Sequence, residues 1–575
     1  MPSSEHNIAH YLPSMASLHP FVRAVVYPQG RDSMGRVAYT HLTFLKLNEQ
    51  CDRFAHGLRR AGIVPGTRVL LMVRPSLEFF ALTFALFKIG AIPILIDPGM
   101  GWRGFMRCVQ QAVPEALIGI PAAHVLRLVF RGVFRSVTIP ITLGKRLFWG
   151  GAALRDLKCS SAPFDVAPVS PEDLAAILFT TGSTGPAKGV QYTHGIFCAQ
   201  TEILRREYDI GPGDIDLPCF PLFALFSTAL GATAVVPDMD PSRPAHVDPM
   251  RIIEPILDQG VTYSFGSPTL WNRVGAYCVD HGVRLPTLRR ILMAGAPVPG
   301  IVHKRLLTNV LPPGADTFTP YGATESLPVA NFRGSEMLSD TLAATTEGAG
   351  MCVGKPIVDV TLKVIRITDA PIEAWDEGLL LPPGEIGEIV VKGQVVTRQY
   401  DHLPEATHLA KIHDGDSIWH RMGDVGYLDD TGRLWFCGRK AHRVETADGP
   451  LYTVRCEAIF NTHDAVYRTA LVGVGPDRSV QTPVIIVETH PEHVPNSPAA
   501  RDELAEQLLA IGATSPLTRT IRRVLFHRSF PVDIRHNAKI KREQLAAWAQ
   551  TQTGGAAPTL PAAPIWHPLV RRCTF

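Results

Sequence analysis

Closely spaced cysteines are missing from this 575-residue chain, whose ten cysteines form no C-x-x-C pair. Zinc sites and dithiol redox centres typically use such pairs, so the sequence argues against both. No apolar run reaches the ~18 residues of a membrane-spanning helix, since Pro93 and Asp97 interrupt the segment 91–97. The opening residues, MPSSEHNIAHYLPS, lack the basic and apolar regions of a secretory signal. These absences predict a soluble, cytoplasmic protein.

An excess of one charge is also lacking. Lysine and arginine number 56 against 53 aspartates and glutamates, a net charge of +3 without charged blocks, so no nucleic-acid partner is indicated. Glycine and proline number 48 each but follow no period, which excludes a fibrous protein. The chain is 46% apolar, enough for a large core, and its length predicts roughly two to four folding units.

The first two-thirds of the chain alternates between helical and extended patterns. Apolar residues have helical spacing over 42–62 and 77–90, and compact apolar runs at 67–73 and 91–96 read as strands. Similar strand patterns recur at 175–179, 261–265 and 290–294. This alternation is typical of an α/β domain with mainly parallel sheets and helices on their faces.

The last third has a different pattern. Residues 385–392 and 426–436 read as hairpin strands, which predicts a β-rich subdomain. A smaller α+β domain then follows, with strands at 469–474 and 483–488 and helices at 501–512 and 541–552. We therefore expect an N-terminal domain over 1–437, a C-terminal domain over 438–552, and an Ala/Pro/Gly-rich, disordered tail over 553–575.

The first chemical motif is the loop after the predicted strand 175–179, with the sequence TTGSTGPAKG over 180–189. Its glycines let backbone N–H groups approach a phosphate closely, and its hydroxyls and Lys188 add donors and charge. Lys188 is followed by glycine, so this is not the ATPase P-loop, and residue 181 is not the glycine that a nucleophile elbow needs. A polar surface loop is the alternative.

Two further motifs place polar groups near predicted strands. In Pro320–Glu325 (PYGATE), the ring could stack on a base and the carboxylate could hold Mg²⁺, although a strand-end turn with a solvated glutamate is the simpler interpretation. Asp424 in MGDVGY and Arg439 in WFCGRK fall on neighbouring predicted strands. They could grip ribose hydroxyls, or form a structural ion pair.

The fourth motif, FPVDIRHNAKIKR over 530–542, places Lys539 in a loop before a helix. Taken alone, this residue would be an exposed lysine near the start of that helix. Its meaning depends on the order of all four motifs.

Together, the Gly/Ser/Thr loop, AGAP over 294–297, YGATE, GD, GR and the late lysine resemble the adenylate-forming enzymes: acyl-CoA synthetases, luciferases and peptide-synthetase adenylation domains. The resemblance covers about residues 20–552. It implies an ATP-dependent ligase with a large AMP-binding domain and a small, mobile C-terminal lid domain, using ATP and Mg²⁺.

The resemblance also implies a role for each matching residue. The phosphate loop would comprise Thr181, Gly182, Ser183, Thr184, Gly185 and Lys188, and the adenine pocket Gly295, Ala296, Pro297, Tyr321 and Gly322. Thr324 would contact the α-phosphate, and Glu325 the Mg²⁺. Asp424 and Arg439 would bind the ribose. Lys539 would sit between the carboxylate and the α-phosphorus, where it counters the developing charge.

Several segments are similar to one branch of the family, the β-lactone synthetases of olefin biosynthesis: 73–80, 220–226, 236–241, 435–440 with 444–446, and 530–540. The chain also departs from the CoA ligases, with Ala224 in place of a common histidine, Ala441 at the usual hinge, and no proline in the pattern before Glu457. The branch implies that a long-chain 2-alkyl-3-hydroxy acid closes to a β-lactone, releasing AMP and pyrophosphate. Intramolecular attack by the β-hydroxyl carries an effective molarity of ~10⁵ M or more.

Two other functions share the same motifs. A long-chain fatty acyl-CoA ligase would use every ATP-site residue named above, and a partner-binding scaffold would keep the fold without catalysis. The intact set of charged residues favours an enzyme over a scaffold.

A basic and apolar stretch over 124–135 lies outside these motifs. It could contact a membrane surface or other olefin-pathway enzymes, or it could be a surface helix with its apolar face in the core. An acyl tunnel could be lined by Phe197, Phe220, Phe223, Phe226 and Leu230, and core packing explains these residues nearly as well.

Overall fold

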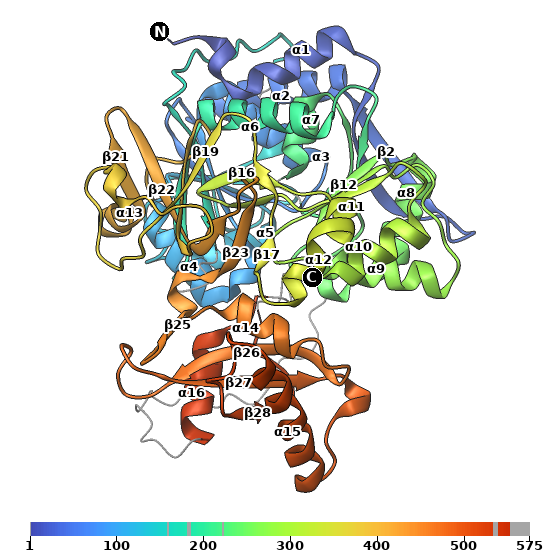
Figure 1. Cartoon of the computed structure of the whole chain (residues 1–575). Helices are drawn as coiled ribbons and strands as arrows, with labels where there is room; N and C mark the ends of the chain where they lie inside the picture. Colours follow the sequence, from blue (N-terminus) through green and yellow to red (C-terminus); the bar gives the residue numbers. More distant parts are fainter. Residues whose placement is uncertain (1, 158–159, 181–185, 221–222, 533–538, 553–575) are drawn as a thin grey trace. The chain divides into compact units, whose positions relative to one another are not determined.

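The computed structural model describes residues 2–157, 160–180, 186–220, 223–532 and 539–552 (Figure 1). It divides into two compact units. The first unit comprises Met1–Arg443 together with Val532–Ile540, and the second comprises Val444–Pro531 with the residues from Lys541 on. The sequence pattern predicts this boundary after residue 437. The predicted tail, 553–575, lies outside the described residues.

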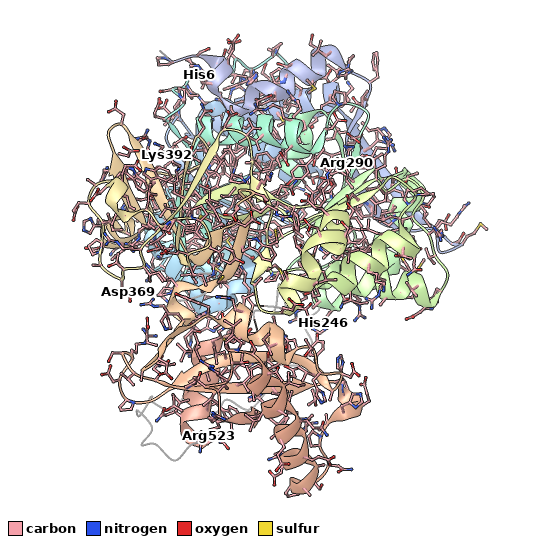
Figure 2. The ribbon with its side chains drawn as sticks, in the orientation of Figure 1. His6, His246, Arg290, Asp369, Lys392 and Arg523 are labelled. Atoms are coloured by element: carbon pink, nitrogen blue, oxygen red, sulfur yellow. The ribbon has the colours of Figure 1, made fainter. Side chains whose placement is uncertain are left out.

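Ion pairs at the end of the first unit account for its extension beyond residue 437. Lys440 Nζ lies 2.8 Å from Glu388 Oε1, and Arg443 Nη2 lies 2.6 Å from Asp369 Oδ2; Asp369 is labelled in Figure 2. The segment from Arg439 to Arg443 is therefore fixed to the first unit by side chains whose partners are distant in the sequence.

The first sheet has seven strands in the order β7-β6-β5-β3-β4-β8-β9, and only β8 and β9 pair antiparallel. Its strands are β3 (Arg68–Met72), β4 (Ile92–Ile96), β5 (Ala116–Gly119), β6 (Ile139–Thr142), β7 (Ala152–Ala153), β8 (Leu174–Thr180) and β9 (Lys188–Thr193). Alternate residues face opposite cores: Leu71 packs with helices α2 (Phe44–Arg60) and α3 (Leu77–Ile89), and Leu70 packs with α4 (Gly101–Ala112). Burial on both faces explains why these strands read as continuous apolar runs.

The second sheet has a similar arrangement, although the sequence shows no internal repeat and the antiparallel edge pair of this sheet comes first in the chain rather than last. Its order is β14-β13-β12-β10-β11-β1-β2, with the only antiparallel pair again at one edge. The strands are β1 (Arg23–Arg31), β2 (Val37–Thr43), β10 (Ile215–Asp216), β11 (Thr233–Val235), β12 (Tyr263–Gly266), β13 (Arg290–Met293) and β14 (Asp316–Phe318). Helices α8 (Met250–Gln259) and α9 (Pro268–Asp280) bury their apolar faces against it.

The β-rich part of the first unit contains two antiparallel sheets. One contains β15 (Tyr321–Ala323), β16 (Ser326–Asn331) and β18 (Lys355–Pro356). The other contains β17 (Met351–Cys352), β19 (Val360–Ile365), β20 (Gly387–Gly393), β21 (Lys411–Asp414), β22 (Ser417–Leu428) and β23 (Leu434–Arg439). The remaining helices of this unit are α1 (Tyr11–Leu18), α5 (Pro121–Val129), α6 (His194–Tyr208), α7 (Ala224–Leu230), α10 (Gly300–Arg305), α11 (Gly334–Glu336), α12 (Leu342–Thr346) and α13 (Pro404–Ala410).

The second unit is a small α+β structure with its own core. Strands β26 (Val466–Val474), β27 (Thr482–Thr489) and β28 (Val524–Phe526) form one sheet, and β24 (Val444–Thr446) pairs with β25 (Gly449–Leu451). The helices are α14 (Thr453–Phe460), α15 (Pro498–Thr514) and α16 (Arg542–Gln552). Glu457 on α14 accepts two hydrogen bonds from Arg542, at 2.6 and 2.9 Å, and one from the Leu471 N–H. The glutamate that departs from the CoA-ligase pattern therefore holds this unit together.

The predicted fold class is confirmed: mainly parallel sheets, a β-rich part and a small α+β unit are all present. Local signals explain the element ends. Thr43 and Ser76 cap α2 and α3 by accepting backbone hydrogen bonds from Lys46 and Phe79, and α3 ends at Gly90, whose φ is 78°. Within the part of the chain that the structure describes, no helix is both long and apolar enough to cross a membrane.

Candidate active site

The predicted adenine-site segments follow two neighbouring parallel strands. Residues Gly295–Pro297 come directly after β13, and Tyr321 follows β14, whose Phe318 pairs in register with Leu292 of β13. The carboxyl ends of parallel strands meet at one edge of a sheet, which is where ligands bind in such folds. Gly322 is required in β15, because a Cβ there would lie 2.8 Å from the Ser326 carbonyl oxygen.

Tyr321, Asp424 and Arg439 form one contact group. The Tyr321 hydroxyl donates a 2.7 Å hydrogen bond to Asp424 Oδ2, and Arg439 Nη1 lies 2.7 Å from Asp424 Oδ1. Asp424 and Arg439 are paired residues of the antiparallel strands β22 and β23, so the backbone register brings them together. The predicted motifs YGATE, GD and GR therefore meet at one carboxylate.

Electrostatics couple this group to Lys539. Burial raises the pKa of Asp424, while the charges of Arg439 and Lys539 and the Tyr321 hydrogen bond oppose that rise. The negative charge of Asp424 raises the pKa of Arg439, and Glu325 adds to this effect. Lys539 belongs to the first unit and is half-buried. The late lysine of the sequence thus lies within electrostatic range of the Asp424–Arg439 pair.

Glu325 is connected to Lys188 through one tyrosine that the sequence analysis did not identify. The Tyr400 hydroxyl donates a 2.7 Å hydrogen bond to Glu325 Oε1, and Lys188 Nζ lies 4.6 Å from the centre of the same ring. Tyr400 reaches this position because it forms a β-bridge with Val190 of β9, next to Lys188. Two distant motifs are therefore held together by a residue that belongs to neither.

Buried polar groups beneath Glu325 were also missed. The backbone N–H and side-chain hydroxyl of Thr397 donate hydrogen bonds to the Glu325 carbonyl oxygen, at 2.9 and 3.0 Å. Lys411 Nζ donates in turn to the Thr397 carbonyl oxygen, and burial lowers the pKa of Lys411 to about 7. Thr397 and Lys411 belong to no recognisable sequence motif, so only the fold could reveal their contacts with Glu325.

Thr324 is fixed from the opposite side. Its carbonyl oxygen accepts a hydrogen bond from the hydroxyl of Tyr192, which is buried on β9. The turn that carries Thr324 and Glu325 is therefore held by Tyr192 and Thr397 before any substrate binds. Such preorganisation is what electrostatic stabilisation of a transition state requires.

The predicted phosphate loop connects β8 to β9. Thr181, Gly182, Ser183, Thr184 and Gly185 lie outside the described residues. The structure does show that β8 leads into this loop and that Lys188 begins β9. Gly189 follows, where a Cβ would lie 2.9 Å from the Phe179 ring, so the glycine after Lys188 has a packing reason.

A column of aromatic side chains begins at Tyr192. Its ring centre lies 4.9 Å from that of Phe197, which lies 6.0 Å from Phe226; Phe223 then stacks on Phe265 at 3.9 Å. This aromatic column joins the Thr324–Glu325 turn to the interior of the first unit. It provides an apolar neighbourhood on one side of the charged site.

The donor set suits a magnesium nucleotide. Among the described residues, no group of three or more His, Cys, Asp or Glu side chains could hold a metal ion. Mg²⁺ instead binds through one or two carboxylates together with substrate phosphates, which fits the single carboxylate of Glu325. Lys188, Arg439 and Lys539 are the positively charged members of the predicted site.

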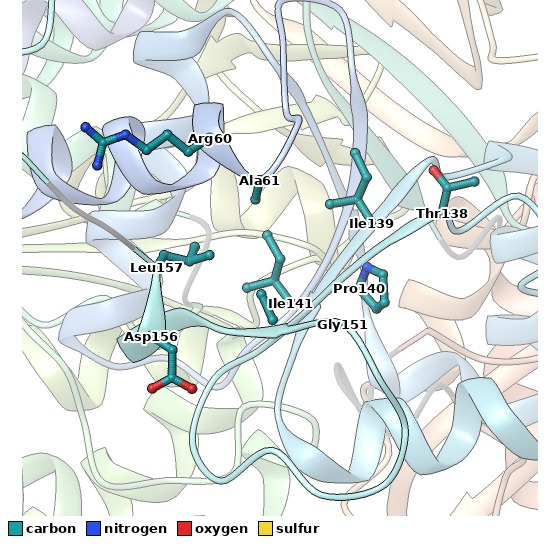
Figure 3. A pocket seen from close by; sticks show the side chains of 10 residues that line it. Arg60, Ala61, Thr138, Ile139, Pro140, Ile141, Gly151, Asp156 and Leu157 are labelled. Carbon is teal, nitrogen blue, oxygen red and sulfur yellow. The ribbon is translucent and has the colours of Figure 1, made fainter.

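Two cavities lined by described residues lie apart from this group. One, of about 360 Å³, is lined by Ile139, Ile141 and Leu157, with Arg60 and Asp156 at its rim (Figure 3). The other, of about 280 Å³, lies near Cys198 and Glu202. Neither is lined by a predicted site residue.

Comparison with known proteins gives three findings. Residues 16–401 match the family described as AMP-binding enzyme. The chain is 48% identical to the olefin beta-lactone synthetase of Xanthomonas campestris, over 95% of this chain and 98% of that protein, and 26% identical to the long-chain-fatty-acid–CoA ligase of Thermus thermophilus, over 82% and 84%. The solved structure of the amide bond synthetase McbA from Marinactinospora thermotolerans superimposes with a TM-score of 0.75 at 23% identity, covering 94% of this chain and 99% of that one. The structural match supports the same fold.

Proposed function

The chain belongs to the AMP-binding enzyme family, and we propose that it activates a β-hydroxy carboxylic acid with ATP and closes it to a β-lactone. The identity of 48% over nearly the whole length of an olefin beta-lactone synthetase carries this proposal. The long-chain-fatty-acid–CoA ligase of Thermus thermophilus is only 26% identical. The proposed substrate is a long-chain 2-alkyl-3-hydroxy acid.

The first half-reaction forms an acyl-adenylate. A carboxylate oxygen of the substrate attacks the α-phosphorus of ATP, the bond to the β-phosphate breaks, and pyrophosphate leaves. Negative charge grows around the α-phosphate during this step. The positive charges of Lys539 and Arg439 both interact electrostatically with Asp424, so the two cations belong to the same part of the site. Lys539 is proposed to counter the charge on the transferring group.

The nucleotide is proposed to bind as follows. Tyr321 would stack on adenine beside Gly295, Ala296, Pro297 and Gly322, while Asp424 and Arg439 would hold the ribose. Thr324 would contact the α-phosphate, and Lys188 and the loop 181–185 would hold the β- and γ-phosphates. Glu325 would bind Mg²⁺, which would neutralise phosphate charge. The contact of Tyr321 with Asp424 supports this arrangement, since base and ribose are neighbours in ATP.

The second half-reaction closes the ring. The β-hydroxyl oxygen attacks the acyl carbon, the carbon–oxygen bond to AMP breaks, and the hydroxyl proton is released. Both reacting groups belong to one molecule, so no second substrate has to enter the site. The aromatic column that starts at Tyr192 supports an apolar chain as the remainder of the substrate.

The test supplies purified protein with ATP, Mg²⁺ and a synthetic long-chain 2-alkyl-3-hydroxy acid, with and without CoA. We expect AMP release and a β-lactone, identified by NMR, in the absence of CoA. The matched substrate without the hydroxyl should support ATP–pyrophosphate exchange but give no lactone. Product formation that depends strictly on CoA would show an acyl-CoA ligase instead.

A further inference from the structure

One surface of the first unit combines solvent-exposed apolar side chains with basic side chains. Helix α5 exposes Val125 and Val129, at 43% and 67%, and the loop between β6 and β7 exposes Leu147 and Phe148, at 60% and 80%. Trp102, at the start of α4, is 60% exposed. Exposed aromatic and aliphatic residues gathered on adjoining elements typically mark an interaction site. We refer to these five residues and the basic residues around them as the α4–α5 surface.

The three elements of this surface are joined by specific contacts. The ring of Trp102 lies 5.7 Å from that of Phe130, which connects α4 to the end of α5. His124 on α5 stacks on Trp149 at 5.8 Å, and Arg127 Nη2 donates a 2.6 Å hydrogen bond to the Trp149 carbonyl oxygen. Trp149 is buried and donates from its indole to Thr142. The loop that carries Leu147 and Phe148 is therefore anchored rather than free.

The stretch 124–135 was predicted either to contact a membrane or a partner, or to be a surface helix with its apolar face in the core. The burial of its side chains shows that it has features of both. Leu126 of α5, and Phe130 and Phe134 in the segment after it, pack into the core with Leu117 of β5, as expected of a surface helix and the chain that follows it. Val125 and Val129 do not take part in that packing and are exposed. The helix therefore has one apolar side in the core and a second one outside, which core packing does not explain.

The charge of this surface is strongly one-sided. Residues 101–150 contain seven lysines and arginines and a single acidic residue, Glu115, whereas the whole chain has a net charge of only +3. Glu115 directly precedes β5, at the opposite end of that strand from α5. The basic side chains at the exposed positions are Arg103, Arg107, Arg131, Arg135, Lys145 and Arg146. The surface is therefore complementary to an anionic partner.

The topology places this surface beside the site. Helix α4, helix α5 and the loop 143–151 follow the carboxyl ends of β4, β5 and β6, and the phosphate loop follows the carboxyl end of β8. These strands are parallel members of one sheet, and β4 is the direct neighbour of β8. All four connections therefore leave from the same edge of the sheet.

We propose that the α4–α5 surface binds an anionic lipid bilayer, with Leu147, Phe148 and Trp102 entering the interface and the basic side chains contacting lipid headgroups. Tryptophan and phenylalanine favour the membrane interface, and each lysine or arginine near an anionic membrane adds attraction. A nucleic acid would use the charges but would leave the aliphatic valines and Leu147 without a partner. This inference does not depend on the proposed lactone chemistry.

The test is flotation of the purified full-length protein with vesicles of phosphatidylcholine, with and without roughly one-third phosphatidylglycerol. We expect binding to the anionic vesicles, loss of binding in high salt, and little binding to pure phosphatidylcholine. The variants L147S/F148S and K145E/R146E should each lower binding by about tenfold or more. These side chains are exposed, so unchanged thermal unfolding will show that the variants are folded.

Matched controls distinguish binding by this surface from non-specific adsorption of exposed apolar residues and from an effect of net charge alone. L18S/F21S removes an equally exposed apolar pair elsewhere, and R284E/R289E changes the net charge by the same amount as K145E/R146E. Both controls should bind like the unmodified protein. The proposal is overturned if the unmodified protein does not float, if the controls lose binding equally, or if L147S/F148S only breaks an oligomer.

Discussion

Tyr400 donates its phenolic hydrogen to Glu325 across 2.7 Å, and the ring that does so also lies 4.6 Å from Lys188 Nζ. One side chain therefore contacts both the proposed magnesium ligand and the proposed phosphate-binding cation. Burial and the charge of Glu325 raise the pKa of the Tyr400 hydroxyl, so it remains a donor at all working pH values. The neutral side chain of Tyr400 therefore separates Glu325 from Lys188 and holds both in place.

The first prediction concerns Tyr400. Y400F keeps the ring beside Lys188 and removes only the hydrogen bond to Glu325. We expect the Mg²⁺ concentration for half-maximal ATP–pyrophosphate exchange to shift by about tenfold or more, since one hydrogen bond to a charged group is worth about 1.5–3 kcal/mol. Y467F, which alters an exposed tyrosine of the second unit, is the control. An unchanged magnesium requirement in Y400F would refute the proposed link.

The second prediction concerns Lys539. K539A should lower the rate of ATP–pyrophosphate exchange by about a hundredfold or more, because it removes charge where negative charge develops. The KM for ATP should change much less. K541A alters an exposed lysine two residues away and should be nearly inert. If K539A formed adenylate at the normal rate, a scaffold role for this fold would regain support.

The third prediction separates the two functions of Tyr321. Y321F retains the ring and loses the 2.7 Å hydrogen bond to Asp424, whereas Y321A loses both. We expect the KM for ATP to rise by a few-fold in Y321F and by about tenfold or more in Y321A, since base stacking is worth about 1–3 kcal/mol. Equal effects in the two variants would mean that the ring does not contact adenine.

The fourth prediction is a pH dependence of stability at Asp216. Burial raises the pKa of this carboxyl from 3.8 to about 8, and Ser227 donates a hydrogen bond to it. The folded protein therefore holds a proton that the unfolded chain has lost, and stability falls as the pH rises from about 4 to about 8.

D216N removes this ionisation. Urea denaturation at pH 8 should give D216N a free energy of unfolding that is higher than that of the unmodified protein by about a few kcal/mol, because the pKa difference between the folded and unfolded states sets this magnitude. The difference should shrink toward pH 5, where the folded Asp216 is protonated. D502N, at an exposed position of α15, should follow the unmodified protein throughout. A D216N protein that is less stable at pH 8 would contradict the assignment.

The sequence predicted those parts of the molecule that depend on local patterns. Helices such as α3 were predicted almost to the residue because Ser76 and Gly90 are strong end signals. Asp424 and Arg439 were predicted as neighbours because hairpin register follows from a turn. Tyr400, Thr397 and Lys411 were not predicted, since they reach Glu325 through contacts between distant segments and no short pattern encodes such contacts.

The domain boundary depends on the same kind of distant contact. Lys440 and Arg443 look like ordinary basic residues in the sequence, and only their partners Glu388 and Asp369 assign them to the first unit. Likewise, Val532–Ile540 groups with the first unit although the second unit precedes it in the chain. Sequence periodicity predicts elements but does not predict which distant elements will share a unit.

The two seven-stranded sheets have similar arrangements but differ in the order in which their strands are synthesised. The first sheet uses only residues 68–193, a continuous stretch. In the second sheet β1 pairs with β11. Val25 therefore cannot pair with Ala234 until some two hundred further residues have been synthesised. We expect the first sheet to resist pulse proteolysis on stalled nascent chains before the second does. The earliest strand to be synthesised would then be among the last to find its neighbour.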